Sequence, residues 1–412
     1  MIKRHIEKEI EEARQHFPVV LLTGPRQVGK STLLVNTYSN KGYEYVSLDD
    51  AGTKALACND PETFLSIHKT PLIIDEAQRA PELFPVIEKI VNESRLKNGN
   101  KKSSGMYILT GSTKHSLLDR AEESLAGRCA IISMWPLSLS EILNRENLPF
   151  LSDISKVDIR SKQSKIKYDD IFKYIVRGFL PLLYDDKKIK SSTFYSAYIT
   201  TYLEKDIKDI LEVRNEVTFI NFLKLLASNI GQELTYEDYS TDIGINIRTI
   251  KNWLDALNKT GIIYFVQPYN ENSIKKRIIK RPKMYFFDTG LAAHLVGIDS
   301  EETLIRSFMK GRFLENAAIN EIRKSFINSG INQELYYYRD SNRNEVDLVY
   351  VKGGKLHLVE IKSGTSFNMS DVSSFKQLNE TKWIKGENAI VSTSNSLSSL
   401  DKNLYIIPIA SI

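Results

Sequence analysis

A short apolar strand, a glycine-rich loop and a helix follow one another in residues 19–34, and this order constrains the fold more than any other feature. The stretch reads "VVLLTGPRQVGKSTLL". It fits the pattern G-x-x-x-x-G-K-[ST] through Gly24, Gly29, Lys30 and Ser31. Glycines let backbone N–H groups surround phosphate oxygens, the lysine adds a positive charge at the outer phosphates, and the serine hydroxyl ligates Mg²⁺. The pattern therefore predicts that the first third of the chain binds a nucleotide.

A second apolar strand, residues 72–74, ends in two acids, Asp75 and Glu76. Beside a phosphate loop, Asp75 is expected to hold Mg²⁺ through water, and Glu76 to polarise the attacking water. The alternative is a strand end that is merely solvated. The nucleotide itself is expected to lie against the whole loop, which consists of Gly24, Pro25, Arg26, Gln27, Val28, Gly29, Lys30, Ser31 and Thr32.

Two later positions complete the predicted nucleotide site. A third strand, in "MYILTGST", ends in hydroxyl groups, of which Ser112 is placed to sense the γ-phosphate, with Thr110 as the second candidate. Arg128 follows a glycine and precedes another strand. It could reach the nucleotide of a neighbouring subunit, or it could be an ordinary surface arginine. The order of strands, loop and helices predicts a parallel α/β sheet with helices on both faces.

These motifs together resemble a known family. The segments "LLTGPRQVGKST", "YVSLDD", "LIIDEAQRAPELFPVI", "ILTGS" and "AGRCAIISMWPLSLSE" are similar to those of prokaryotic AAA+ ATPases that carry a C-terminal domain of unknown function. "IVRGFLPLLY" and "ITTYLEKDIKDI" resemble the segments that close that ATPase module. The family's usual "GG" before the proline is "GF" here, at Gly178 and Phe179. The resemblance implies ATP and Mg²⁺ as cofactors, ATP hydrolysis, and a homo-oligomer formed through the ATPase domain.

Length, composition, cysteine count and net charge limit the classes of protein to which the chain can belong. A chain of 412 residues suggests two or three domains, and 42% hydrophobic with 26% charged residues is ordinary globular composition. No run approaches the ~20 apolar residues of a membrane span, and the charged N-terminal segment has no apolar signal core. We therefore expect a cytoplasmic protein without membrane contact. Cys58 and Cys129 are too few for a disulfide framework or a zinc cluster. The net charge of +5 permits nucleic acid as a partner without arguing for it.

The middle of the chain has the pattern of a winged helix. Residues 153–167 are polar and predict a surface loop or a flexible excursion. Apolar helical spacing then returns in residues 219–230, followed by a helix, a turn at Gly244, a second helix at about residues 246–259 and a strand. Asn246 is a plausible N-cap of that second helix. Its expected buried face consists of Ile247, Ile250, Trp253, Leu254 and Leu257.

Basic residues cluster on the outer face of that helix and on the hairpin that follows it. Such a cluster is typical of proteins that bind duplex DNA. The predicted DNA contacts are Arg248, Lys251, Lys275, Lys276, Arg277 and Lys280. Two alternatives remain open, because winged helices also bind proteins and because charge runs are often only solvated.

The stretch "LHLVEIKSG" places Glu360 and Lys362 on one face of a strand, since they are two residues apart. The preceding strand carries Asp347, and a helix before it carries Glu315 on its apolar side. This set resembles the PD-(D/E)xK nucleases. Asp347 and Glu360 would hold a divalent cation, and Glu315 would add a ligand, directly or through water. Lys362 would position the attacking water or stabilise the developing charge. The alternative is an exposed hairpin with an ion pair.

We therefore predict an α/β protein: a P-loop AAA+ parallel-sheet domain, a winged-helix segment and a small mixed α/β domain like a restriction endonuclease. The predicted boundaries are 1–150 for the ATPase core, 151–212 for a helical closing segment, 213–290 for the winged helix and 291–412 for the nuclease-like domain. The predicted function is ATP-dependent processing of DNA. The competing hypothesis is a non-catalytic, ATP-switched regulator whose C-terminal fold is a scaffold.

Overall fold

The computed structural model describes residues 2–111, 124–202, 216–270, 281–378 and 383–412. The chain folds into two compact units. The first unit comprises residues 4–136 and 259–261, and the second comprises residues 1–3, 137–258 and 262–412. The predicted first boundary at residue 150 thus differs from the structure, where the second unit already includes Leu137. Within the described residues, no helix combines the length and apolarity needed to cross a membrane.

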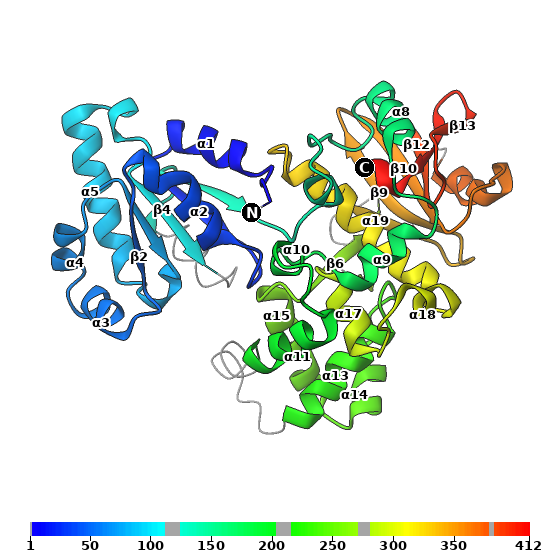
Figure 1. Ribbon diagram of the computed structural model, residues 1–412, viewed down its shortest axis with the longest axis horizontal. Helices are drawn as coiled ribbons and strands as arrows, with labels where there is room; N and C mark the ends of the chain where they lie inside the picture. Colours follow the sequence, from blue (N-terminus) through cyan, green and yellow to red (C-terminus); the bar gives the residue numbers. More distant parts are fainter. Residues whose placement is uncertain (1, 112–123, 203–215, 271–280, 379–382) are drawn as a thin grey trace. The chain divides into compact units, whose positions relative to one another are not determined.

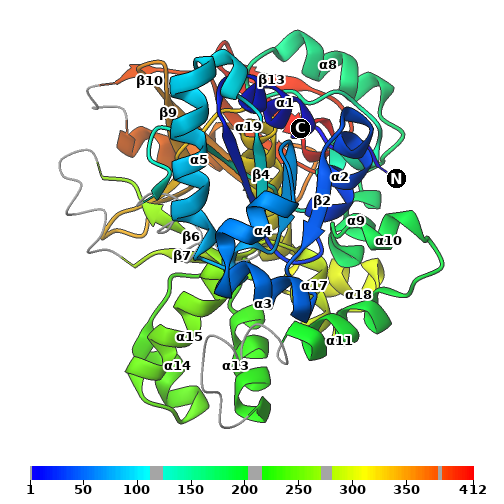
Figure 2. The same ribbon diagram turned by 90° about the vertical axis from the view of Figure 1, so that its left-hand side faces the viewer.

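The first unit is an α/β sandwich (Figure 1). Its elements are α1 (Glu7–His16), β1 (Val19–Thr23), α2 (Lys30–Tyr38), β2 (Glu44–Ser47), α3 (Ala51–Asn59), α4 (Pro61–Ile67), β3 (Leu72–Asp75), α5 (Leu83–Asn98), β4 (Tyr107–Gly111) and β5 (Cys129–Ser133). The strands lie in the order β2-β3-β4-β1-β5, and all neighbouring pairs are parallel. Figures 1 and 2 show α4 and α5 on one face of this sheet and α1 and α2 on the other.

Burial explains why these strands have apolar runs rather than alternating patterns. Every residue of β1 and of β4 is buried, as expected for strands of a parallel sheet covered on both faces. On the face of α3, α4 and α5, the core includes Phe64, Phe84 and Ile87, packed against Leu21 and Ile74 of the sheet. The predicted parallel α/β sheet is confirmed, and its carboxyl edge, where β1 and β3 end, is the place where such sheets bind ligands.

The second unit begins with helices and ends with a mixed sheet. Its helices are α7 (Leu139–Ile142), α8 (Ile154–Gln163), α9 (Asp170–Arg177), α10 (Leu182–Asp185), α11 (Ser191–Tyr202), α13 (Glu216–Ser228), α14 (Tyr236–Ile243), α15 (Ile247–Lys259), α17 (Thr289–Leu295), α18 (Glu301–Arg306) and α19 (Lys310–Ile327). Its strands are β6 (Ile263–Pro268), β7 (Lys283–Phe286), β8 (Tyr336–Arg339), β9 (Glu345–Lys352), β10 (Lys355–Lys362), β11 (Ile384–Lys385), β12 (Asn388–Ser392), β13 (Ser398–Asp401) and β14 (Leu404–Pro408).

One sheet joins the regions predicted to be separate winged-helix and nuclease-like domains. The strands lie in the order β13-β14-β12-β10-β9-β8-β6-β7, with β11 beside β10. The antiparallel pair β6–β7 belongs to the predicted winged helix, yet Gln267 of β6 pairs in parallel with Tyr336 of β8. The predicted boundary at residue 290 therefore falls between elements that share a sheet. This continuity brings β7 close to the strands that carry the predicted metal ligands.

The expected helix-turn-helix order is present in α13, α14 and α15, which lie together in Figure 2. Gly244 ends α14 with φ +74°, a left-handed conformation that favours glycine. Asn246 accepts the backbone N–H of Thr249 at 2.8 Å, so the predicted N-cap of α15 is confirmed. The predicted buried face is correct at four of its five positions; Ile247 is 37% exposed, because it stands in the first turn of the helix.

The predicted surface loop at 153–167 is wrong, because α8 occupies most of it. Asp153 caps the helix by accepting the backbone N–H of Lys156 at 3.1 Å. Val157 and Ser161, four residues apart and therefore on one face, are the buried positions. A stripe this narrow gives little apolar periodicity in the sequence, although lysine, arginine and glutamine are good helix formers.

Candidate functional site

The predicted phosphate loop lies between β1 and α2 in the first unit. Gly24 has φ +153°, and a Cβ atom there would lie 2.1 Å from the carbonyl oxygen of Met134, so only glycine fits. Gly29 has φ +92° and immediately precedes α2. The ammonium group of Lys30 donates to the carbonyl oxygens of Gly24 and Pro25, each at 2.8 Å. The loop therefore folds around its own lysine.

Asp75, at the end of β3, accepts hydrogen bonds from several hydroxyl groups. The Ser31 hydroxyl lies 2.8 and 2.9 Å from its two carboxylate oxygens, and the Tyr45 hydroxyl donates at 2.7 Å. The Thr110 hydroxyl donates as well. Asp75 is 5% exposed, so these donors satisfy a carboxylate that has little contact with water. Carboxylate and hydroxyl oxygens are the ligands that Mg²⁺ prefers, and Ser31 and Asp75 lie close enough to share one ion. The residues fit Mg²⁺.

Glu76 follows directly and has an unusual backbone. Its φ is +57°, which is uncommon for a residue with a side chain and is found most often at functional sites. Its N–H donates to the hydroxyl of Thr110 at 3.2 Å, and the amide of Gln78 donates to its carboxylate. Thr110 therefore links both acids. Ser112, the first candidate for sensing the γ-phosphate, lies outside the described residues.

Sequence reasoning missed Tyr45 and Gln78. Tyr45 lies on β2, and its only sequence signal is its place in the segment "YVSLDD". Gln78 lies two residues after Glu76, in "IIDEAQ". Neither residue type at these positions belongs to the pattern of a phosphate loop or an acid pair, so only the geometry identifies them.

Arg128 lies at the amino-terminal ends of the parallel strands, whereas the phosphate loop lies at their carboxyl ends. Its carbonyl oxygen accepts the N–H of Val19, the first residue of β1, whereas the loop follows the last residue of that strand. Its guanidinium donates to the side chain of Asn92 at 2.7 Å and lies 3.4 Å from the carboxylate of Glu88, both on α5. Among the described residues, the side-chain contacts of Arg128 are thus with α5 and not with the phosphate loop, and both predicted roles stay open.

A second candidate site lies on the mixed sheet of the second unit, where β9 and β10 run antiparallel. Leu348 pairs with Val359, so Asp347 and Glu360 occupy the next position of the register. The carboxylate of Asp347 accepts the backbone N–H of Ile361 at 2.8 Å. The ammonium of Lys362 lies 3.0 Å from an oxygen of Glu360. The three predicted residues of these strands therefore come together.

The acids of this site repel one another. Burial, and then the charges of Glu360 and Glu315, raise the pKa of Asp347 well above its ordinary value, against the lowering effect of Lys283. Burial also raises the pKa of Glu360, to about 6, although Lys362 lowers it. One oxygen of Glu360, Oε2, is buried with no hydrogen-bond partner in the described part of the chain. An unsatisfied carboxylate oxygen of this kind fits a divalent cation.

Glu315 reaches the same region from α19 but makes different contacts. Its carboxylate accepts the hydroxyl of Tyr285 at 2.6 Å and lies 2.8 Å from the ammonium of Lys283. Lys283 is 3% exposed and also lies 2.5 Å from the carboxylate of Glu345. In the part of the chain that is described, no three His, Cys, Asp or Glu side chains converge to hold a metal ion. The donors that fit a cation are thus Asp347 and Glu360, while Glu315 is engaged by Lys283 and Tyr285.

The predicted DNA contacts are described only in part. Arg248 and Lys251 are exposed on α15, and the ammonium of Lys251 lies 5.0 Å from the ring centroid of Tyr236. Lys275, Lys276, Arg277 and Lys280 lie outside the described residues. Acidic side chains occur close by, since Glu237 and Asp238 stand in the first turn of α14. The exposed surface of these helices therefore carries both signs of charge.

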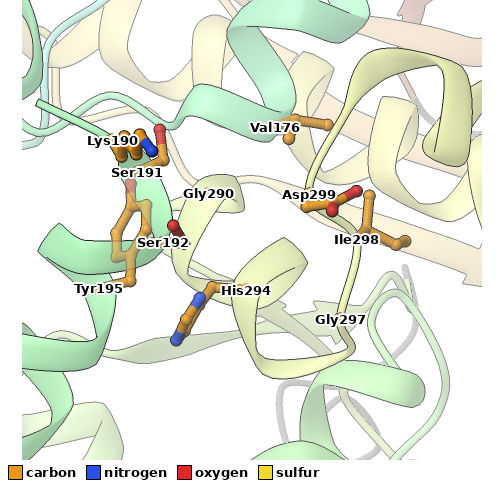
Figure 3. A pocket seen from close by; sticks show the side chains of 10 residues that line it. All are labelled: Val176, Lys190, Ser191, Ser192, Tyr195, Gly290, His294, Gly297, Ile298 and Asp299. Carbon is orange, nitrogen blue, oxygen red and sulfur yellow. The ribbon is translucent and has the colours of Figure 1, made fainter. Parts of the chain in front are cut away.

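A hollow of about 520 Å³ lies between α11 and α17 (Figure 3). Lys190, Ser191 and Ser192 line it from the start of α11, and His294 lines it from α17. None of the predicted site residues lines this hollow, so it belongs to neither the nucleotide site nor the acidic site.

Comparisons with known families divide the chain into three parts. Residues 16–143 match the family described as an AAA domain. Residues 168–302 match a domain of unknown function (DUF8612), and residues 310–412 match another (DUF4143). The first match supports an AAA-type P-loop ATPase, in agreement with the parallel sheet and the phosphate loop. The other two carry no stated function.

The curated relatives that match are named as uncharacterized proteins. An uncharacterized protein of Mycobacterium tuberculosis is 28% identical over 370 residues, which cover 89% of this chain and 75% of that protein. An uncharacterized protein of Methanocaldococcus jannaschii is 23% identical over 342 residues, covering 75% and 69% respectively. The likeness therefore extends well beyond the ATPase unit.

Solved structures are less similar. A Walker-type ATPase of Pyrococcus abyssi is 16% identical with a TM-score of 0.41, covering 72% of this chain and 96% of that chain. DnaA of Aquifex aeolicus, solved with AMPPCP bound, is 15% identical with a TM-score of 0.23, covering 61% and 85%. At TM-scores this low, neither structure carries an argument about the site.

Proposed function

We propose that the first unit binds and hydrolyses ATP. The observation that supports this most strongly is the pair of contacts, at 2.8 and 2.9 Å, between the Ser31 hydroxyl and the Asp75 carboxylate. They connect the start of the helix after the phosphate loop with the end of β3, which is the arrangement that Mg²⁺-dependent phosphoryl transfer requires.

Each residue then has a defined task. The loop 24–32 would bind the phosphates through its backbone N–H groups, and Lys30 would bind the outer phosphates. Ser31 and Asp75 would hold Mg²⁺, which offsets charge on the phosphates. Glu76 would orient the attacking water and accept its proton, with its carboxylate held by Gln78. Thr110 belongs to β4 and is hydrogen-bonded to the Asp75 carboxylate and to the backbone N–H of Glu76. It would therefore couple a change in either acid to a shift of β4.

Substitution of Glu76 by glutamine tests this proposal. Glu76→Gln keeps the size of the side chain but removes the proton acceptor, so ATP binding should be retained and hydrolysis should fall by about 100-fold or more. Glu93→Gln, an exposed glutamate of α5, is the matched control and should hydrolyse ATP at the wild-type rate. Wild-type hydrolysis by the Glu76→Gln protein would show that the catalytic assignment is wrong.

We also propose that the acidic site cleaves phosphodiester bonds in DNA. The supporting observation is the buried Oε2 of Glu360, which has no partner among the described residues and lies beside a second carboxylate. Asp347 and Glu360 would bind a divalent cation, which lowers the pKa of a bound water. Lys362, held 3.0 Å from Glu360, would orient that water or stabilise the charge on the phosphate.

A scaffold function is the second candidate for this region. It is favoured by Lys283, which already engages Glu315 and Glu345 and so removes two carboxylates from any metal site. The chain would then be an ATP-switched regulator.

Incubation of supercoiled, linear and single-stranded DNA with Mg²⁺, with and without ATP, would separate the nuclease from the scaffold function. Cleavage that is lost in Lys362→Ala supports the nuclease, whereas no cleavage and no metal-dependent stabilisation of the wild type leaves the scaffold.

DNA contact through α15 and the basic segment after β6 is proposed separately. Substitution of Lys275, Lys276, Arg277 and Lys280 by alanine should weaken binding across all sequences. It should also reduce the salt dependence by about one unit per lost phosphate contact. Arg248→Ala and Lys251→Ala test the helix in the same way. DNA affinity that does not change in these variants would place the helices among protein-binding modules.

Oligomerisation and the role of Arg128 are tested together. If Arg128 reaches a neighbouring subunit's nucleotide, mixing Arg128→Ala chains with Lys30→Ala chains should restore part of the ATPase activity. Some interfaces then pair an intact Lys30 from one variant with an intact Arg128 from the other. Absence of rescue in a mixture that still oligomerises would make Arg128 a structural partner of α5.

A further inference from the structure

Lys283 is a buried cation placed among acids. It is the first residue of β7, and its side chain is 4% exposed. Its ammonium lies 2.8 Å from Glu315 and 2.5 Å from Glu345, and 5.4 Å from the ring centroid of Tyr337. Burial by itself lowers the pKa of Lys283, but the charges of Glu315, Asp347 and Glu345 outweigh it and raise that pKa above the ordinary value. Lys283 is therefore charged whenever the protein is folded at neutral pH.

The charges around Lys283 fall into two groups. Glu315 and Glu345 both contact it, and Arg339 lies 3.7 Å from the other oxygen of Glu345. Asp347 and Glu360 form the second group, where Lys362 is the neighbouring cation and, within the described ranges, forms an ion pair with Glu360 only. Asp347 forms no ion pair among the described residues, although the charge of Lys283 acts on it; its carboxylate accepts a hydrogen bond from the backbone N–H of Ile361. The first group thus has two contacting cations for two carboxylates, whereas the second has one contacting cation for two carboxylates among the described residues.

We infer that Lys283 is a resident counter-ion that takes the place of a second divalent cation, so that the acidic site binds one ion, at Asp347 and Glu360. The inference rests on the proposed metal-dependent site. Lys283 does not touch the reacting atoms in this account. It is a positioning residue, which holds Glu315 and Glu345 together by charge and keeps them from acting as metal ligands.

The geometry favours this role over that of an ordinary structural ion pair. A simple pair would need one acid, yet the lysine lies between carboxylates from two elements, α19 and β9, while coming from a third. Removal of the lysine would leave Glu315 with no cation, and Glu345 with Arg339 alone, beside Asp347 and Glu360. Four carboxylates so placed would attract divalent cations more strongly, because the Coulomb energy grows with each added negative charge.

The test replaces Lys283 by methionine, which keeps an unbranched stem but removes the charge, and by arginine, which keeps the charge. Mn²⁺ is titrated into the full chain without nucleotide, and both melting temperature and heat of binding are recorded. An Asp75→Asn background removes any ion bound at the nucleotide site. Lys283→Met should bind two Mn²⁺ ions where the parent binds one, with the midpoint of stabilisation at about tenfold lower Mn²⁺. Lys283→Arg should behave as the parent.

The outcomes separate this inference from the proposed nuclease. If Lys283→Met unfolds without metal, recovery of its fold by Mn²⁺ supports the inference, and failure of Mn²⁺ to recover it overturns it. A folded Lys283→Met protein with the parent's ion count and midpoint also overturns it. If the parent binds no Mn²⁺ but Lys283→Met does, the counter-ion role stands and the proposed metal-dependent cleavage by the natural chain fails.

Discussion

The nucleotide site and the acidic site both place carboxylates on strands, but they stabilise them in opposite ways. Asp75 accepts hydrogen bonds from three hydroxyl groups, so its charge is satisfied by neutral donors of the protein. Asp347 and Glu360 face other carboxylates, and their pKa values are raised. The carboxylate of the first site is thus satisfied by hydrogen bonds from the protein itself. The second holds an excess of negative charge that a cation would relieve, and this contrast can be tested site by site.

The largest effect is expected at the nucleotide site. Lys30→Ala removes the only side-chain cation that contacts the loop carbonyls of Gly24 and Pro25 among the contacts described, and with it the charge for the outer phosphates. ATP binding, measured by calorimetry, should weaken by at least about 100-fold. Lys54→Ala, an exposed lysine of α3, is the control. Unchanged ATP affinity in Lys30→Ala would contradict the assignment of the loop.

The next effect concerns metal binding at the acidic site. Asp347→Asn removes one of two repelling carboxylates, so the metal-free protein should become more stable and the stabilisation by Mg²⁺ should disappear. In the wild type that stabilisation should approach about 2.7 kcal/mol at a metal concentration about 100 times the Kd. Asp242→Asn, on the exposed side of α14, should keep the metal effect. A metal effect of wild-type size in Asp347→Asn would place the ion elsewhere.

The pH dependence of stability should show the same repulsion without metal. Burial raises the pKa of Glu360 from 4.5 to about 6, so the folded state binds more protons than the unfolded state between these values. Stability should therefore fall as pH rises through this window, by about 2 kcal/mol, since each pKa unit corresponds to ~1.4 kcal/mol. The pKa of Asp347 is raised as well, so this residue also makes the protein less stable as pH rises. Glu360→Gln should lose most of this slope in denaturant titrations, and a slope of unchanged size would show that another group causes it.

The smallest effect is expected at Tyr45. Tyr45→Phe removes one of the hydroxyl donors to Asp75 and leaves the others, so the carboxylate stays partly satisfied. The loss of one such hydrogen bond costs ~1 kcal/mol, which corresponds to about a fivefold rise in the KM for Mg·ATP with kcat nearly unchanged. Tyr405→Phe in β14 is the control. A large fall in kcat instead would give Tyr45 a part in the chemical step.

The nucleotide site could be predicted because its residues form contiguous motifs at strand ends. Gly29, Lys30 and Ser31 are adjacent, and Asp75 with Glu76 closes an apolar run. The contact between Ser31 and Asp75 then follows from the parallel order of the strands. Tyr45 could not be predicted, because a tyrosine on a strand is ordinary core material unless its register is known.

The acidic site could be predicted only in part. Asp347, Glu360 and Lys362 share two adjacent strands joined by a Gly353–Gly354 turn, which the sequence indicates directly. Lys283 is distant in sequence and lies in a basic run that predicts a solvated hairpin. Its burial depends on the pairing of β6 with β8, a long-range parallel contact that has no local sequence signal.

We propose that one chain carries two separate sites for phosphate chemistry: one whose carboxylate is satisfied by hydrogen bonds, and one whose carboxylates need a cation. Hydrogen exchange of the full chain with Mg²⁺ alone, and then with Mg²⁺ and a non-hydrolysable ATP analogue, tests this most directly. Mg²⁺ alone should slow exchange in residues 345–362 and leave residues 24–32 unchanged, and the analogue should then protect residues 24–32. Exchange in residues 345–362 that does not respond to Mg²⁺ under either condition would contradict the account.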